Sequence, residues 1–191
     1  MARKRKFEKE KVVLKAMKLF WEKGYNGTSM ENLVSSLGIN RASMYGSFGS
    51  KTNLYNLSVQ EYSTIKITGV EKVFGKQQNV RKGFSELFKD LLNQNEADVR
   101  GCFIVNTTTE LGGKNTELDN TLKEYGYKMI TAFKNYLSYG AAQGQISPYK
   151  DLEMISKYFY HLENGLQVAL MQEVKKEELI KTVQMALSVL G

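Results

Sequence analysis

The sequence predicts an all-α protein of about nine helices, in which a three-helix N-terminal domain with helix–turn–helix spacing precedes a larger helical domain. A single proline in 191 residues leaves long helices uninterrupted. Apolar residues recur mostly at every third or fourth position, which is the period of an amphipathic helix. Residues 1–51 hold 11 Lys or Arg and 4 Asp or Glu, whereas residues 52–191 hold 16 of each. The net charge of +7 therefore lies in the first quarter of the chain and favours a polyanionic partner such as DNA.

The overall composition is typical of a soluble globular protein, with 42% hydrophobic and 25% charged residues. No stretch approaches the roughly 18 apolar residues that span a bilayer, and the charged N-terminus lacks the apolar core of a signal peptide. The single cysteine cannot form an internal disulfide, and together these features favour a cytoplasmic protein. The basic run at residues 3–6 is expected to be a mobile arm that is either solvated or in contact with phosphates.

The first helix is expected over about Glu8–Lys23. Its apolar stripe consists of Val12, Val13, Ala16, Leu19 and Phe20. Gly24 then stands where a glycine commonly ends a helix. Thr28 or Ser29 can cap the second helix. Because Asn32, rather than Glu or Gln, stands three residues after Ser29, the usual reciprocal capping box is not expected.

A short turn at residues 37–40 separates the second helix from the third. Gly38 supplies the left-handed residue of that turn, and Asn40 is a good N-cap for a helix over Arg41–Phe48. Met44 and Phe48, four positions apart, are expected to point inward. The outward side is then left with Arg41, Ala42, Ser43 and Gly46.

The fourth helix is expected to begin just after Gly49, with Ser50 as its cap and Lys51 in its first turn. A positive side chain at a helix N-terminus is opposed by the helix macrodipole, so Lys51 is a poor choice for stability alone. It is a good choice if a phosphate docks there, because the free N–H groups and the ammonium then act together. The alternative is an exposed lysine with a small energetic cost.

Five further amphipathic segments follow this fourth helix, which is expected to end near Gly69 or Gly75. They are expected near residues 80–92, 101–111, 116–140, 152–170 and 179–190. Two adjacent glycines at positions 112 and 113 separate the second of these segments from the third, and Pro148 lies in the connection before the fourth.

Residues at fixed spacing run through the first third of the chain in the pattern A-x-x-L-F-x-x-x-G-Y-x-x-T-S, then L-x-x-x-L-G-I-x-x-x-x-x-Y-x-x-F-x-S-K-x-x-L. They are Ala16, Leu19, Phe20, Gly24, Tyr25, Thr28, Ser29, Leu33, Leu37, Gly38, Ile39, Tyr45, Phe48, Ser50, Lys51 and Leu54. This pattern resembles the N-terminal domain of TetR-type bacterial transcriptional repressors. The resemblance implies a helix–turn–helix DNA-binding domain at residues 1–52 and a helical effector-binding and dimerisation domain at residues 53–191.

The resemblance also implies a homodimer that binds palindromic double-stranded operator DNA and releases it when a small-molecule effector binds. It assigns DNA contacts to Thr28, Arg41, Ala42, Ser43, Tyr45, Gly46 and Lys51. Arg41 and its two successors match the base-reading start of the recognition helix, and an Arg fork can bond bidentately to guanine O6 and N7. The other matched side chains would contact phosphates. Gly46 departs from relatives that carry a larger residue, which allows close backbone approach but leaves a side-chain contact there in doubt. Tyr45 has the alternative of a partly buried core aromatic.

The last two helices, by the same resemblance, pair with their copies in a second subunit, although an amphipathic stripe is equally typical of an ordinary core face. The effector itself is unknown. Its pocket candidates are Phe84, Phe88, Cys102, Phe103, Asn106, Tyr125, Met129, Phe133, Tyr158 and His161. The alternative for the apolar ones is plain core. Thr109 and Glu110 are further polar candidates that either orient a ligand or face water.

The segment Gly101–Leu111 resembles a Gly-Cys helix in one branch of the family, some of whose members sense electrophiles or oxidants through that cysteine. A helix N-terminus and the neighbouring Arg100 would both lower the pKa of the Cys102 thiol. The alternative is a buried cysteine that only packs.

Two other classes of function remain to be weighed. An enzyme is not expected, since one histidine and one cysteine would have to meet to form a nucleophile–base pair. No metal motif or phosphate-binding loop is present, so no metal or cofactor is expected. The remaining alternative is a helical protein-interaction module whose basic N-terminal domain does not read DNA sequence.

Overall fold

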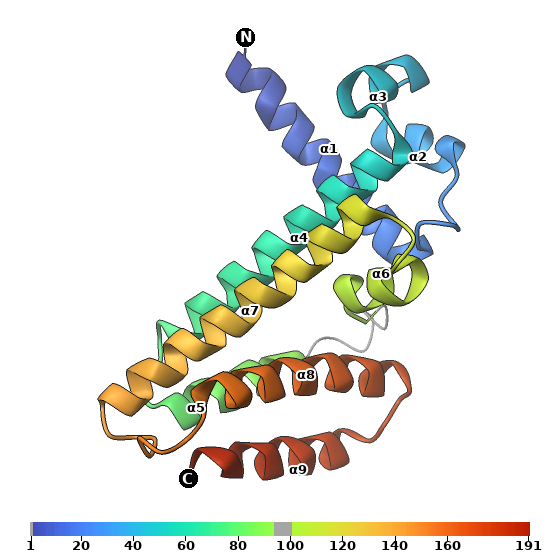
Figure 1. Ribbon diagram of the computed structural model, residues 1–191. Coiled ribbons are helices and arrows are strands. Elements are labelled where there is room, and N and C mark those ends of the chain that lie inside the picture. Colours follow the sequence, from blue (N-terminus) through green and yellow to red (C-terminus); the bar gives the residue numbers. More distant parts are fainter. Residues whose placement is uncertain (1, 94–100) are drawn as a thin grey trace. The chain divides into compact units, whose positions relative to one another are not determined.

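The structure, a computed structural model, describes residues 2–93 and 101–191. These residues form nine α-helices and no strand, which confirms the all-α prediction (Figure 1). The helices are α1 (Ala2–Lys23), α2 (Met30–Leu37), α3 (Arg41–Phe48), α4 (Lys51–Phe74), α5 (Val80–Leu92), α6 (Phe103–Leu111), α7 (Thr116–Ala142), α8 (Leu152–Met171) and α9 (Lys176–Leu187). A short 3-10 helix, Ser188–Leu190, follows α9.

The chain divides into two compact units. The head unit comprises Met1–Ile65 and Asn106–Leu122, and the body unit comprises Lys66–Val105 and Lys123–Gly191. Helices α4, α6 and α7 therefore each contribute residues to both units. The head unit is larger than the DNA-binding domain predicted at residues 1–52, because the first part of α4 and a second segment from the middle of the chain pack with it.

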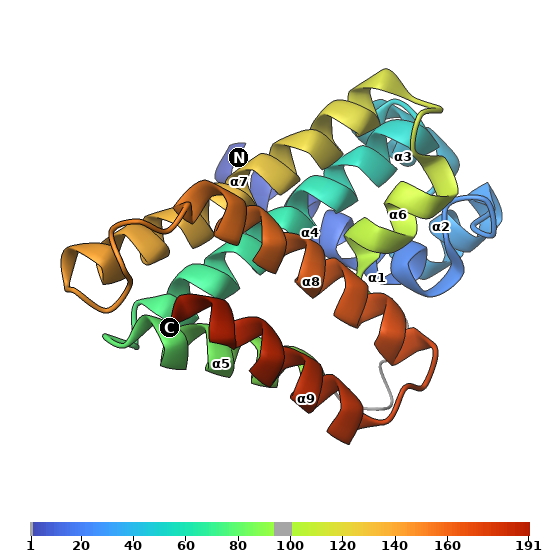
Figure 2. The same cartoon turned by 60° about the horizontal axis from the view of Figure 1, so that its bottom comes forward.

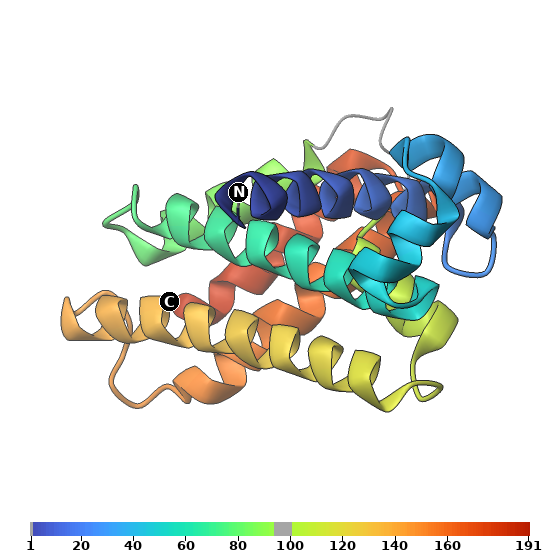
Figure 3. The same ribbon diagram turned by 90° about the horizontal axis from the view of Figure 1, so that it is seen from above.

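The core of the head unit forms where α1 crosses the first part of α4 (Figures 1 and 3). The ring of Phe20 meets that of Tyr55 edge to face, with 4.8 Å between centroids. The predicted stripe of α1 is buried at Ala16, Leu19 and Phe20, whereas its two valines are only half-buried. The inward residues expected on α3, Met44 and Phe48, are buried. Of the four apolar residues of α2, Leu33 and Leu37 are buried, whereas Met30 and Val34 are only half-buried.

Hydrogen bonds fasten α6 and the start of α7 to α4 within the head unit. The hydroxyl groups of Tyr55 and Thr107 form a hydrogen bond, and their oxygens lie 2.9 Å apart. Burial raises the pKa of Tyr55 to about 12, so its hydroxyl keeps its proton at neutral pH. Asn56 donates to Glu117 at 2.9 Å and accepts a bond from Thr121 at 2.8 Å. The head therefore includes more than its three N-terminal helices.

The body unit has an aromatic core whose rings come from α4, α5, α7 and α8. Helices α5, α8 and α9 pack against one another (Figure 2). The ring of Phe84 on α5 lies 4.5 Å from that of Phe159 and 5.4 Å from that of Phe133, measured between centroids. Gly83 leaves room for a neighbouring ring, because a Cβ there would clash with the side chain of Tyr136.

Helix boundaries differ from the predictions at three places. Helix α1 begins at Ala2 rather than at Glu8, so the basic run predicted as an arm lies within the helix. Helix α6 begins at Phe103, after Gly101, whose φ of +66° lies in the left-handed region that favours glycine. Helix α9 spans Lys176–Leu187 and so begins and ends about three residues before the segment expected at residues 179–190. The other ends agree closely, and α4 ends at Phe74, just before the second of the two glycines proposed.

Candidate nucleic-acid interface

The helix–turn–helix of the head unit consists of α2, a left-handed turn and α3. Gly38 has φ +66° and its N–H bonds to the carbonyl of Val34, which ends α2. Asn40 caps α3, because its side chain accepts the N–H of Ser43 at 2.7 Å. Three sequence predictions, the turn residue, the cap and the Arg41–Phe48 helix, are therefore confirmed.

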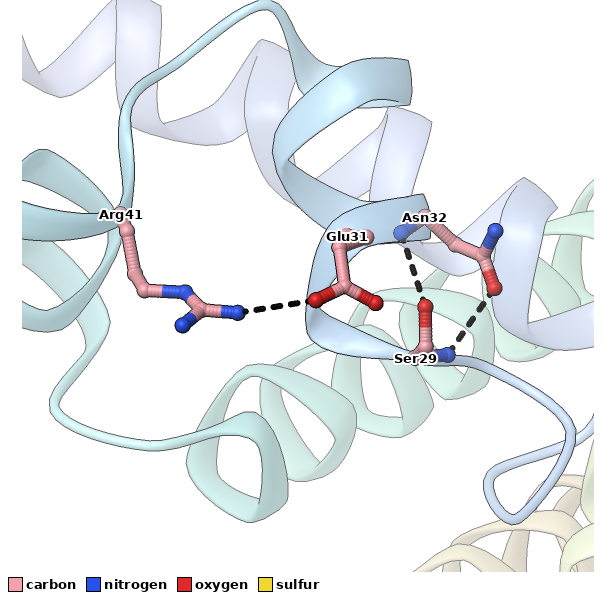
Figure 4. Close-up of polar contacts among 4 residues, drawn as sticks. All are labelled: Ser29, Glu31, Asn32 and Arg41. Atoms are coloured by element: carbon pink, nitrogen blue, oxygen red, sulfur yellow. Dashed lines mark hydrogen bonds and ion pairs between the residues drawn. The ribbon is translucent and has the colours of Figure 1, made fainter.

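A reciprocal capping box begins α2, contrary to the prediction (Figure 4). The Ser29 hydroxyl accepts the N–H of Asn32, and the Asn32 carbonyl oxygen accepts the N–H of Ser29, both at 3.0 Å. The prediction was wrong because it required Glu or Gln at the third position. The shorter amide side chain supplies the same acceptor, so it satisfies the same backbone donor.

The outward side of α3 carries the residues predicted to read DNA. Arg41, Ala42, Ser43, Tyr45 and Gly46 are all exposed, whereas Met44 and Phe48 are buried on the opposite side. Open space surrounds Gly46, since a Cβ built there meets nothing within 4 Å. Packing within the head unit therefore does not require a glycine at position 46. The outward side of α3 carries no side chain at this position.

Arg41 carries an ion pair with an acidic residue of α2 that the sequence analysis did not single out. Its guanidinium Nη2 lies 3.3 Å from Oε1 of Glu31, as Figure 4 shows. Both side chains are exposed, so this pair contributes at most about 1 kcal/mol. The contact orients the guanidinium, but it is weak enough that the edge of a guanine can replace the carboxylate.

Lys51 lies beside an aromatic ring at the N-terminus of α4. Its ammonium is 4.2 Å from the centroid of the Tyr25 ring, a cation–π distance. The Tyr25 hydroxyl in turn shares a 2.8 Å hydrogen bond with Thr52. The N-terminal turn of α4 is capped by Ser50, which accepts the N–H of Asn53 at 3.0 Å. Lys51 is also the first residue of α4, and the N-terminus of a helix is suited to bind an anion such as a phosphate.

Thr28 does not share the exposure of the other matched residues. Its side chain is fully buried, and its hydroxyl donates to the carbonyl of Gly24 at 2.6 Å. The side chain is therefore engaged in the turn between α1 and α2, and its burial disfavours the predicted phosphate contact.

Glu110 of α6 holds the same turn from the other side. Its carboxylate accepts the N–H of Tyr25 at 3.0 Å and that of Asn26 at 2.8 Å. The sequence analysis expected Glu110 either to orient a ligand or to face water. Instead, its carboxylate binds backbone N–H groups of the turn. No sequence signal identifies this partner, because 84 residues separate Glu110 from Asn26.

Most apolar pocket candidates are core residues of the body unit. Phe84, Phe88 and Phe133 belong to the aromatic core described above. Met129, Phe103 and Tyr125 are buried as well, and Asn106 is half-buried in the head unit. Burial agrees with both readings of these side chains, as pocket lining or as plain core.

Two candidates lie on the surface instead. Tyr158 is 43% exposed and His161 is exposed, so the prediction of an inward position was wrong for Tyr158. They stand three apart on α8, four and seven positions after the exposed Met154. The helical period therefore places them together on the outer stripe of α8, opposite the buried Phe159.

Cys102 is buried, with 3% of its surface exposed, and it precedes the first residue of α6. A reactive thiolate requires access, so the burial favours the packing alternative over the sensor. Arg100, the proposed positive neighbour, lies outside the described residues.

An open pocket of about 490 Å³ lies in the body unit, where no site was predicted. It is lined by Glu71, Phe74, Gly75, Gln77, Gln78, Ala132, Asn135, Tyr136 and Tyr139. Among the described residues, no three His, Cys, Asp or Glu side chains are grouped so that they could hold a metal ion. None of the described helices has the length and apolar character needed to cross a bilayer.

Comparison with known proteins agrees with this geometry. Residues 13–57 match the family model of bacterial regulatory proteins, tetR family. The chain is 24% identical to the HTH-type transcriptional repressor ComR of Escherichia coli (strain K12), over 92% of this chain and 85% of that protein. It is 26% identical to the uncharacterized HTH-type transcriptional regulator YezE of Bacillus subtilis (strain 168), over the full length of both.

A solved structure shares the fold over nearly the whole chain. It is a cysteine mutant of the TetR family transcriptional regulator CifR, complexed with 26bp double-strand operator DNA. The TM-score is 0.84 and the identity 24%, over 95% of this chain and 96% of that chain. The fold and the exposed third helix define a helix–turn–helix regulator of transcription. Its N-terminal domain matches the tetR family of bacterial regulatory proteins, and the fold of the chain is that of a TetR-family regulator.

Proposed function

We propose that this protein is a transcriptional repressor that binds a palindromic DNA operator as a homodimer and releases it when a small-molecule effector binds. The observation that supports DNA reading best is the outward side of α3, where exposed Arg41, Ala42 and Ser43 stand at the N-terminal end of the helix. The small neighbours let the helix approach the major-groove floor while Arg41 reaches a guanine. Tyr45 and Lys51 flank this end and contact phosphates.

The dimer is proposed from exposed apolar side chains on the last two helices. They are Met154, Tyr158, Val168 and Met171 on α8 and Ile180 and Met185 on α9. Large side chains of this kind gathered on two adjacent helices are typical of an association surface. A two-fold dimer presents two reading helices, which matches the symmetry of a palindrome.

Effector release is proposed to act through a shift between two conformations. Helix α6 is suited to transmit it, since its first residues, 103–105, belong to the body unit and its last residues to the head unit. Glu110, near the end of α6, accepts a hydrogen bond from the backbone N–H of Tyr25. The ring of Tyr25 in turn contacts the ammonium of Lys51. A change in the position of α6 would therefore alter the phosphate-binding end of the head.

Selection of bound sequences from random duplex DNA tests this function. The salt concentration should be about 150 mM, where nonspecific phosphate attraction is weakened. We expect a palindrome whose half-sites are centred about one helical turn, or a multiple of it, apart. Sequence-blind binding, or none above background, would contradict the proposal and favour a protein-interaction module.

Lys51→Ala should weaken binding to all DNA sequences alike. In the homodimer it removes two phosphate contacts, one from each subunit, so the slope of log K against log salt should fall in magnitude by about 1.8. Filter-binding or fluorescence titrations at several salt concentrations measure this slope. Lys82→Ala, a substitution of an exposed lysine of α5, is the matched control and should leave the slope unchanged. An altered base preference in Lys51→Ala would refute the phosphate role.

Met185→Asp should dissociate the dimer without unfolding the chain. Met185 is 76% exposed, so a charge there costs little in the monomer but is desolvated in a dimer. Sedimentation velocity at micromolar concentration should show the mass fall from two chains to one. Gln143→Asp, at an exposed position after α7, is the control. A dimer that persists in Met185→Asp would place the interface elsewhere.

Glu110→Gln should loosen the turn at residues 24–26 and lower operator affinity. The amide keeps one acceptor but loses the charge that strengthens both hydrogen bonds. The expected loss in stability of the turn is about 1 kcal/mol, since the carboxylate is half-buried. Faster hydrogen exchange at the Tyr25 and Asn26 amides would demonstrate it. Glu178→Gln, at an exposed site on α9, controls for the change in charge; unchanged exchange in Glu110→Gln would rule out the clamp.

A further inference from the structure

Two polar side chains on α8 are buried in the body unit without the hydrogen bonds that they need. Glu163 is 4% exposed and Gln167 is 2% exposed. The Glu163 Oε2 atom and the Gln167 Nε2 atom have no hydrogen-bond partner among the described residues. The two side chains stand four positions apart, so they lie on the same face of α8. One supplies an acceptor and the other a donor.

This arrangement is costly unless something completes it. A buried polar group that lacks its hydrogen bond destabilises a fold by roughly 1–3 kcal/mol. Burial also raises the pKa of the Glu163 carboxyl, and the nearby positive charge of Lys66 offsets this only in part. The Lys66 ammonium is 3.9 Å from the other carboxylate oxygen, at the limit of an ion pair. Lys66 therefore leaves Oε2 available.

The surroundings connect this pair to one of the pocket candidates. Tyr160 stands three positions before Glu163 on α8. Its ring is 6.4 Å from that of Tyr125, measured between centroids. Burial raises the pKa of the Tyr160 hydroxyl, a hydrogen bond with Asn164 lowers it, and negative charge on Glu163 raises it further. Tyr125 was proposed to line the effector pocket, so the polar pair lies in the same region of the body unit.

We propose that Glu163 and Gln167 together bind the polar head of the effector, and that this head is an uncharged group that donates one hydrogen bond and accepts one. A carboxamide is the simplest example: its N–H donates to Glu163 Oε2 and its carbonyl accepts from Gln167 Nε2. The inference rests on the proposed effector response, because it identifies the class of molecule that the body unit takes.

The charges near the pair exclude the two charged alternatives. An anionic head would meet the Glu163 carboxylate at short range, and Lys66 is the cation that the described residues place beside that carboxylate. A cationic head would be repelled by Lys66 and would leave the Gln167 amide donor unsatisfied. An uncharged head with both functions satisfies both buried atoms and adds no net charge to a desolvated site.

Four probes with the same ring test this proposal by ligand-observed fluorine NMR. They are 4-fluorobenzamide, its N,N-dimethyl derivative, 4-fluorobenzylamine and 4-fluorobenzoate. We expect 4-fluorobenzamide to bind at least about tenfold more tightly than the other three, which is the size of one hydrogen bond. Equal affinities for all four probes, or no binding of the amide, would overturn the proposal.

Two variants of the pair distinguish recognition from a structural role. Gln167→Met keeps the length of the side chain and removes the donor, so it should weaken 4-fluorobenzamide binding about tenfold while its melting temperature stays the same or rises. Glu163→Gln removes the negative charge, so it should reduce the discrimination against 4-fluorobenzoate. Gln172→Met, at the exposed end of α8, is the control.

The outcome is separable from that of the DNA-binding proposal, since the probes are measured without DNA. If the Gln167→Met chain melts at a lower temperature and binds all probes as the parent does, the pair is structural and the inference is wrong. Operator binding by the same preparations would show that the function proposed for the head stands regardless.

Discussion

Arg41→Ala is expected to weaken binding to the selected operator by about 1–3 kcal/mol for each half-site, a factor of roughly 5–150. The loss of binding free energy should be confined to one base pair in each half-site, the pair whose guanine the guanidinium reaches. Binding to unrelated DNA should change little, because nonspecific affinity comes from phosphate contacts. Competition titrations with operators substituted at each position in turn measure both effects.

The ion pair between Arg41 and Glu31 supplies the control for this prediction. Glu31→Gln keeps the guanidinium and removes the carboxylate that competes for it at 3.3 Å. Operator affinity should then stay the same or rise, with base preference retained. If Arg41→Ala left the preference at every position untouched, the assignment of the reading end of α3 would be wrong.

Phe84→Ala is expected to cost about 3–5 kcal/mol of stability, the usual range for removing a buried aromatic ring. Phe84 is fully buried, and its ring contacts those of Phe74, Phe133 and Phe159 at centroid distances between 4.5 and 5.4 Å. These partners come from three other helices, so removal of the ring leaves a cavity among them. The free energy of unfolding should therefore fall by much of the total that a domain usually has.

Urea unfolding followed by circular dichroism measures this loss. Tyr149→Ala is the matched control, since that aromatic side chain is 96% exposed and its removal should change stability by less than about 0.5 kcal/mol. Stability of Phe84→Ala within about 1 kcal/mol of the parent would contradict the assignment of Phe84 to the core and would favour an adaptable pocket around it.

The local structure of the head was predictable because short-range chemistry decides it. Gly38 adopts the left-handed conformation and Asn40 caps α3, as the sequence indicates. The three-to-four spacing of Met44 and Phe48 determines which side of α3 faces inward, and hence that Arg41 faces outward. Even the missed capping box at Ser29 was a local feature; only the list of acceptable residues was too narrow.

Contacts between distant segments were not predictable in this way. Nothing near Glu110 in the sequence indicates that its carboxylate binds the backbone of residues 25 and 26. Likewise, a helical stripe gives the relative orientation of residues on α8 but does not say which stripe is covered. Tyr158 was therefore assigned to the interior, whereas the opposite face of α8, with Glu163 and Gln167, is the buried one.

The sequence by itself determined the helices, their caps, the location of the positive charge and the residues presented by α3, because propensity, periodicity and charge act over a few residues. Only the tertiary structure decided which amphipathic faces are buried and which polar groups find partners. Those outcomes depend on side chains brought together from segments far apart in the chain, and it is such contacts that place Glu110 at the head and leave Glu163 and Gln167 buried with unused hydrogen-bonding capacity.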